Sequence, residues 1–255
     1  MRPAHRLPLT AYALGCLIGC SGLSPLRNIA VVGRDAYAVF VADDPGGRPD
    51  LFAVRADGGR VVQITFTTVA EARPALSPDG SAVAFLRARS TADSVPGAIW
   101  VENLVTGAER ELALPPGAGP ADRVGWAPDG RTLYAGAGPD VFSLPAPPAS
   151  GAARRLGPGE RSAAESSFSV LVGDPPFGRV VQCGRALCVE GHGPPVPFAE
   201  DARSPARWGP DSVGYLAGDE LVVRPVGPGR ARRVGWTGVP PHPRDLTFFP
   251  GRPRS

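Results

Sequence analysis

Few residues of this chain could carry out acid–base or nucleophilic chemistry. The chain holds 3 histidines in 255 residues, and only His192 and His242 lie beyond its first ten residues. A hydrolytic triad needs a histidine base beside a nucleophile, and a zinc site needs several nitrogen or sulfur ligands. No Gly-x-Ser-x-Gly elbow, His-Glu-x-x-His helix, Walker loop or dinucleotide fingerprint is present. We therefore predict no catalytic residue, no metal ligand and no cofactor.

The charged clusters have simple structural explanations. Asp43, Asp44 and Asp50 could offer oxygen ligands to Ca²⁺, but they lack the alternating spacing of an EF-hand loop, which favours a solvated turn. The arginine pairs at 154–155 and 232–233 fall on expected outer strands, where charge prevents edge-to-edge pairing. The formal net charge is only +3, so we expect no nucleic-acid partner.

The composition favours an all-β protein. The 33 Gly and 31 Pro exclude long helices, because neither residue is tolerated inside a helix. A disordered chain is the alternative, but the 43% hydrophobic content supplies a core to bury.

A turn motif repeats along the chain. Ser-Pro-Asp-Gly at residues 77–80 recurs as Ala-Pro-Asp-Gly at 127–130 and Gly-Pro-Asp-Ser at 209–212, with degenerate copies at 173–176 and 249–251. Short apolar strands follow each copy, and the period of about 40 residues is that of a four-stranded propeller blade. The repeated Asp79, Asp129 and Asp211 are expected to form turns, and Trp126 and Trp208 to pack between blades.

Residues 50–136 carry a family resemblance. The segments Asp-Leu-Phe-Ala-Val-Arg-Ala-Asp-Gly-Gly at 50–59, Gln-Ile-Thr at 63–65 and Pro-Ala-Leu-Ser-Pro-Asp-Gly at 74–80 resemble the WD-like repeat of TolB-type β-propellers. The resemblance implies a β-propeller of four-stranded blades. It implies little about function, because this repeat occurs in scaffolds, binding proteins and peptidase domains.

The number of units predicts five blades. Full units begin near residues 28, 69, 121, 166 and 202, and residues 243–251 offer one further strand. A lone strand would leave an exposed edge, so we expect it to join the first blade and close the ring. A sixth blade built from both termini is the alternative.

The N-terminal residues resemble a bacterial lipoprotein signal. An apolar run from residue 7 to 18 ends in Leu17-Ile18-Gly19-Cys20, which resembles a lipobox. We predict a signal peptide at 1–19, a diacylglyceryl group on Cys20, a tether at 20–27 and a single propeller domain at 28–255. An ordinary signal peptide with a chance cysteine is the alternative, and Cys16 fits the motif less well.

Cys183 and Cys188 are predicted to form a disulfide. They flank four residues of an expected β-hairpin, and directly opposed residues in such a hairpin have Cα atoms about 4.5–5.5 Å apart. An exported protein meets an oxidising compartment. A register slip of one residue would instead leave two free thiols.

The longer loops predict the binding face. In a four-stranded blade, the loops between the second and third strands and the links between blades share one face; here these are residues 43–49, 87–97, 115–121, 157–163 and 236–241. Binding usually resides on variable loops, so we predict Arg87, Arg89, Trp236 and His242 as ligand-binding residues. Ring closure should bring Trp236 and His242 to Asp43 and Asp44.

These observations predict a lipid-anchored, extracytoplasmic propeller in the cell envelope that binds another envelope protein or peptide. A propeller enzyme of lyase or lactonase type is the alternative, and it would need His242 and acidic residues gathered at the channel mouth. A degenerate propeller within a larger assembly is a third possibility.

Overall fold

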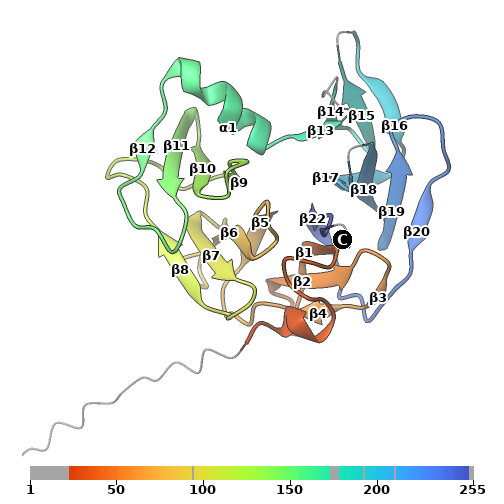
Figure 1. Cartoon of the computed structure of the whole chain (residues 1–255), viewed down its shortest axis with the longest axis horizontal. Coiled ribbons are helices and arrows are strands. Elements are labelled where there is room, and N and C mark those ends of the chain that lie inside the picture. Colours follow the sequence, from red (N-terminus) through yellow and green to blue (C-terminus); the bar gives the residue numbers. More distant parts are fainter. Residues whose placement is uncertain (1–22, 94, 173–177, 192, 210, 253–255) are drawn as a thin grey trace, which may run out of the picture.

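The computed structural model describes residues 23–252 except 94, 173–177, 192 and 210. These residues form five four-stranded antiparallel sheets arranged around a central axis, which confirms the predicted five-bladed propeller (Figure 1). No helix in this part of the chain is long and apolar enough to cross a bilayer.

The strands of each blade are given in order from the innermost to the outermost. Blade 1 contains β22 (Arg244–Phe249), β1 (Tyr37–Asp43), β2 (Pro49–Arg55) and β4 (Val62–Gln63). Blade 2 contains β5 (Glu71–Leu76), β6 (Ala82–Arg87), β7 (Ala98–Asn103) and β8 (Glu109–Leu112). Blade 3 contains β9 (Arg123–Trp126), β10 (Thr132–Ala137), β11 (Asp140–Pro145) and β12 (Arg154–Arg155).

The last two blades complete the ring. Blade 4 contains β13 (Val170–Val172), β14 (Gly178–Cys183), β15 (Ala186–Glu190) and β16 (Val196–Ala199). Blade 5 contains β17 (Ala202–Arg207), β18 (Ser212–Ala217), β19 (Glu220–Pro225) and β20 (Arg232–Val234). A short parallel pair, β21 (Trp236–Thr237) with β3 (Gly59–Arg60), joins blades 5 and 1 at the outer edge.

The C-terminal strand closes the ring, as the edge argument predicted. β22 pairs antiparallel with β1, with Phe249 opposite Tyr37 and Thr247 opposite Val39. The prediction that a first unit begins near residue 28 is wrong in detail: residues 25–28 form the 3₁₀ helix η1 (Pro25–Asn28), and β22 supplies the innermost strand of blade 1.

The repeated turn residues act as the sequence predicts. The Asp79 carboxylate accepts hydrogen bonds from the Ser81 amide and hydroxyl, and Asp129 accepts from the amides of Arg131 and Thr132. Gly80 and Gly130 follow at φ +68° and +65°, a conformation that costs glycine nothing.

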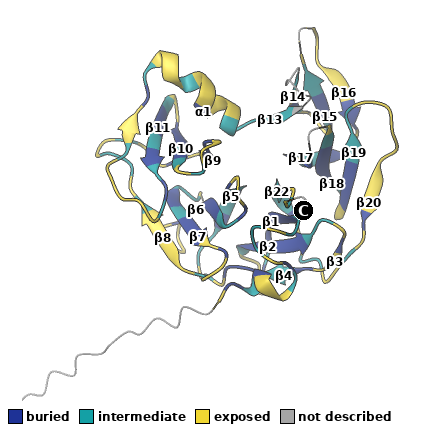
Figure 2. Ribbon diagram, viewed as in Figure 1, coloured by how far each residue is buried: buried dark blue, intermediate teal, exposed yellow. Residues whose placement is uncertain are grey.

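The core lies between neighbouring blades, where apolar faces of adjacent sheets meet. Trp126 donates its indole N–H to the Ala75 carbonyl of blade 2 at 2.8 Å, and the Trp208 ring stacks on Phe248 of blade 1. Both tryptophans therefore pack between blades, as predicted. Figure 2 shows burial concentrated on the middle strands of the blades and exposure on the outer strands β8 and β20. Arg154 and Arg155 on β12 and Arg232 and Arg233 on β20 are exposed.

Blades 3 and 4 are joined by a helix where the sequence predicted a loop. The helix α1 (Arg161–Ser167) runs between β12 and β13 in Figure 1. Its Ala164 is buried against Val141 and Leu156, with Tyr134 and Phe168 packed alongside. Residues 160–171 contain neither Gly nor Pro, so the local sequence permits this helix.

The structure joins Cys183 and Cys188 by a disulfide in the β14–β15 hairpin, with Cα atoms 6.0 Å apart. The register differs from the expected one: Cys183 lies opposite Ala186, and Cys188 opposite Val181. The two cysteines are thus diagonal neighbours on one face of the hairpin, still within disulfide reach.

Candidate functional site

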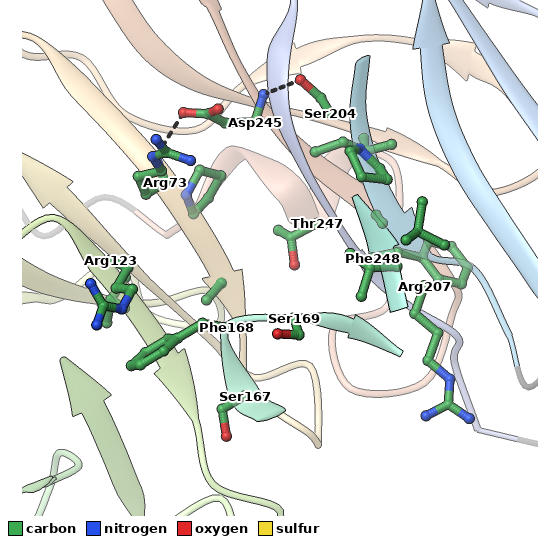
Figure 3. Close-up of a pocket in the computed structure, with 18 of the residues that line it drawn as sticks. Arg73, Arg123, Ser167, Phe168, Ser169, Ser204, Arg207, Asp245, Thr247 and Phe248 are labelled. Carbon is green, nitrogen blue, oxygen red and sulfur yellow. Dashed lines mark hydrogen bonds between the residues drawn. The ribbon is translucent and has the colours of Figure 1, made fainter. Parts of the chain in front are cut away.

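A cavity of about 480 Å³ lies on the axis of the propeller, lined by the innermost strands and by the end of α1 (Figure 3). This volume is within the range of ligand-binding pockets in proteins. Phe168 and Phe248 contribute apolar walls, and the polar lining is dominated by four arginines, Arg73, Arg123, Arg179 and Arg207.

Bulges in three of the inner strands shape this cavity. Arg73, Ser204 and Asp245 have φ values of +56°, +53° and +50°, and the strand register shifts beside each of them. This backbone conformation is uncommon for residues other than glycine and occurs where the surrounding structure maintains it.

Hydrogen bonds between blades hold the bulges in place. The Asp245 carboxylate accepts the Arg73 amide at 3.0 Å, and the Asp245 amide donates to the Ser204 hydroxyl at 3.0 Å. Both bonds are drawn in Figure 3. They link blades 5, 1 and 2 around the channel, so the cavity wall is a connected polar network.

The charge of the cavity is positive. Arg123 contacts Asp122 and Glu165 and lies over the Phe168 ring, and Arg179 pairs with Glu190. Across the described residues, no carboxylate lies within ion-pair distance of Arg73 or Arg207, and both side chains are exposed to solvent. The Arg207 guanidinium donates only its Nε–H, to the Gly209 carbonyl at 3.2 Å, so both groups keep donors that could bind a carboxylate.

The strand directions place Arg73 near one mouth of the channel. Each inner strand begins after a link between blades, and these links share a face with the loops between second and third strands. We call this the long-loop face and the opposite one the tight-turn face. Arg73 and Arg123 stand near the start of their strands and therefore near the long-loop face, whereas Arg207 ends β17 toward the other face.

Arg87 does not lie in a loop, contrary to the sequence-based expectation. It ends β6, and its side chain is only 8% exposed. Its guanidinium contacts Glu71 at 2.7 Å and Glu109 at 2.6 Å and lies 4.4 Å from the centre of the Trp100 ring. Because its guanidinium is already paired with two carboxylates, Arg87 has a structural role and is not available to a ligand.

Arg89 and Trp236 lie away from the channel. Arg89 is exposed in the turn after β6, where its amide donates to Asp93. The Trp236 ring packs on Phe40 with ring centres 5.1 Å apart, and its N–H donates to the Asp219 carbonyl. Trp236 thus helps to join blades 5 and 1 and presents little free surface.

His242 does approach Asp43, as ring closure predicted. Its Nδ1 lies 2.8 Å from Asp43 Oδ2, while Arg244 donates to Asp43 Oδ1 at 3.1 Å and to the His242 carbonyl at 2.8 Å. His242 has φ +53° and is exposed. With Asp44, it lines a second cavity of about 520 Å³ beside the channel on the long-loop face.

The three aspartates considered for Ca²⁺ do not converge. Asp43 faces His242, while Asp44 pairs with Arg48, whose amide hydrogen bond holds the pKa of Asp44 below its usual value. Asp50 is buried and accepts from Gln63, and burial raises its pKa to about 6. No group of three or more potential metal ligands occurs among the described residues.

Cys20, His192, the signal peptide predicted at 1–19 and the turn copy at 173–176 lie outside the residues that the structure describes. Arg73, Arg207 and Asp245 were not among the residues predicted from the sequence. Arg73 and Ser204 each precede a proline in an innermost strand. This shared position before proline is the sequence feature that could have indicated the two bulges.

Comparisons with known proteins support the fold. No family model and no curated protein matches the chain. Among solved structures, the chain is similar to TolB from Acinetobacter baumannii, with a TM-score of 0.54 and 15% identity, covering 88% of this chain and 68% of that one.

Two further structures are more distant. A TolB-type structure from Agrobacterium tumefaciens matches with a TM-score of 0.38 and 11% identity, over 80% of this chain and 70% of that one. A chain of a nidogen–laminin complex matches with a TM-score of 0.40 and 10% identity, over 80% of this chain and 79% of that one. The likeness to the Acinetobacter baumannii protein supports a shared propeller fold and says nothing of binding partners.

Proposed function

We propose that this protein is a lipid-anchored, extracytoplasmic propeller that binds an acidic segment of another cell-envelope protein in its central channel. The observation that carries the proposal is the cavity lined by Arg73 and Arg207, neither of which has a carboxylate partner in the described part of the chain. A cavity of about 480 Å³ accommodates a few residues of extended peptide rather than a folded domain. Glu or Asp side chains of such a peptide would pair with the two guanidinium groups.

The lipid anchor supports this role by retaining the propeller at a membrane. The supporting observation is the lipobox-like Leu17-Ile18-Gly19-Cys20. Replacing Cys20 with Ser should release the protein from the membrane fraction after export. A Cys20→Ser protein that remains membrane-bound would contradict the anchor.

Binding is tested with defined peptides. Fluorescence anisotropy should detect binding of an extended Glu/Asp-rich peptide and not of a Lys-rich peptide of equal length. The Arg73→Glu and Arg207→Glu variants should each weaken this binding at least about tenfold, or about 1.4 kcal/mol. Arg230→Glu, an exposed arginine outside the cavity, is the matched control. Equal affinity in all three variants would place the site elsewhere.

A propeller enzyme is the second candidate, and the Asp43–His242 contact favours it. A carboxylate that accepts from Nδ1 of histidine orients the imidazole and leaves its second nitrogen available as a base. The His242 pair lies beside the channel cavity and does not line it. Hydrolysis of simple sugar lactones that is lost in His242→Asn, with peptide binding intact, would support this alternative; absence of lactone turnover would exclude that reaction.

A further inference from the structure

The N-terminal segment of the described chain is docked on the tight-turn face. Ser24 and Leu26 are fully buried, and Figure 1 shows η1 at the rim of the ring beside β4. The Ile29 carbonyl accepts from Arg55, the Ala36 carbonyl from the Ala56 amide, and the Arg34 carbonyl from the Arg252 amide. Arg55 ends β2, Ala56 begins the turn that follows it, and Arg252 lies shortly after β22, so all three partners are at the tight-turn end of blade 1. Ser24 and Leu26, which fall within the tether predicted at 20–27, are therefore packed on the propeller.

Exposed apolar side chains gather around this segment. Leu23, Val31 and Val105 are 51%, 50% and 50% exposed. Val31 and Val105 directly follow Ala30 and Leu104, which are both members of the buried cluster between blades 1 and 2. Val105 lies in the turn between β7 and β8, on the tight-turn face. Val31 and Val105 therefore flank one buried cluster, to which Leu26, three residues after Leu23, also belongs.

Two arginines accompany these apolar residues. Arg27 and Arg34 are exposed beside these apolar residues. Arg27 has no carboxylate within ion-pair distance among the residues the structure describes, and Arg34 contacts only Asp35, at 3.3 Å. The nearby acids are Asp35, which pairs with Arg34, Asp57, which pairs with Arg55, and Asp79, whose carboxylate accepts from Ser81. Among the described residues, Arg27 is therefore the cation here that has no ion-pair partner.

We propose that these five residues, Leu23, Arg27, Val31, Arg34 and Val105, form a membrane-contacting patch that rests on an anionic phospholipid surface. Apolar side chains enter the boundary between headgroups and acyl chains, and arginines bind anionic headgroups. We call these residues the basal patch. The inference rests on the proposed anchor at Cys20.

The covalent chain restricts where the membrane can lie. Three residues separate Cys20 from the buried Ser24, and four Cα–Cα steps of about 3.8 Å span at most about 15 Å. A lipid attached at Cys20 therefore brings the bilayer to the basal patch and not to the opposite face. The long-loop face, with Arg73 near its channel mouth, then points away from the membrane toward a partner.

The test imposes the anchor chemically, so that it does not depend on lipidation in cells. Protein comprising residues 20–255 is coupled through Cys20 to maleimide phospholipid in vesicles containing phosphatidylglycerol. An environment-sensitive fluorophore is placed by a non-cysteine reaction at residue 105 or, as a matched control, at residue 95. Val95 is 73% exposed in the loop between β6 and β7, on the long-loop face.

A nitroxide quencher in the lipid phase should quench the fluorophore at residue 105 several-fold more than the one at residue 95. In the Arg27→Glu/Arg34→Glu variant, this difference should shrink, and it should no longer increase with the phosphatidylglycerol content. Equal quenching at both positions, or stronger quenching at residue 95, would overturn the orientation. If quenching at residue 105 were the same in the wild type and in the Arg27→Glu/Arg34→Glu variant, the proposed patch would be wrong. Failure of Cys20 lipidation in cells would contradict the anchor, while this assay would still report on the patch.

Discussion

Replacing Arg87 with alanine tests whether this arginine stabilises the fold rather than binding a ligand. The Arg87→Ala variant leaves Glu71, which is 1% exposed, without the cation 2.7 Å away, and it also removes the contact with the Trp100 ring. Removing one partner of a buried ion pair costs about 3–5 kcal/mol. Domains are typically stable by about 5–15 kcal/mol, so the expected loss is a large fraction of the total.

The loss should depend on pH in a defined direction. Burial raises the pKa of Glu71 to about 7 from an ordinary value of 4.5, although Arg87 and Thr65 oppose the increase. Without Arg87 this pKa must rise further. At pH 4.5 or below, the Glu71 carboxyl is neutral in both the folded and the unfolded protein, so its burial costs little free energy. At higher pH the carboxyl ionises in the unfolded protein, and folding must then either protonate it or bury an unpaired charge, which lowers the free energy of unfolding. The destabilisation by Arg87→Ala should therefore be larger at pH 8 than at pH 5.

Urea unfolding followed by tryptophan fluorescence at pH 5 and pH 8 provides the measurement. Arg89→Ala is the control, because this exposed arginine lies two residues away and has no ion-pair partner among the described residues. Its free energy of unfolding should stay within about 0.5 kcal/mol of the wild type. Equal unfolding free energies for the two variants at pH 8 would refute the structural role of Arg87.

The other predictions concern buried groups and cross-links. Burial raises the pKa of Glu102 to about 8, so wild-type stability should fall as pH rises from about 4.5 through 8, and Glu102→Gln should flatten that part of a urea-midpoint profile. Trp208→Ala should cost about 3–5 kcal/mol in urea titrations because it removes the stacked ring that joins blades 5 and 1, whereas the exposed Phe66→Ala should change stability little. The denatured, unreduced protein should show no labelling of Cys183 or Cys188, and the double Ser variant should lose about 2 kcal/mol, since the closed loop is short.

The sequence alone determined the fold class, because turn and strand signals are local. Pro-Asp-Gly turns separate runs of four to six apolar residues, and both act over a few neighbouring positions. The exposed-edge argument also predicted that β22 completes blade 1. The approach of His242 to Asp43 followed from that closure, without any side-chain information.

The tertiary structure alone decided which charges are free. Arg87 and Arg73 cannot be distinguished by local sequence, yet Arg87 lies buried between two glutamates and Arg73 lines the central cavity. The helix α1 was likewise not predicted from the sequence, because its residues lie between units of a repeat made of strands. The Arg73 amide is held by Asp245, 172 positions away along the chain. Burial and charge compensation depend on such distant partners, and only the closed ring brings them together.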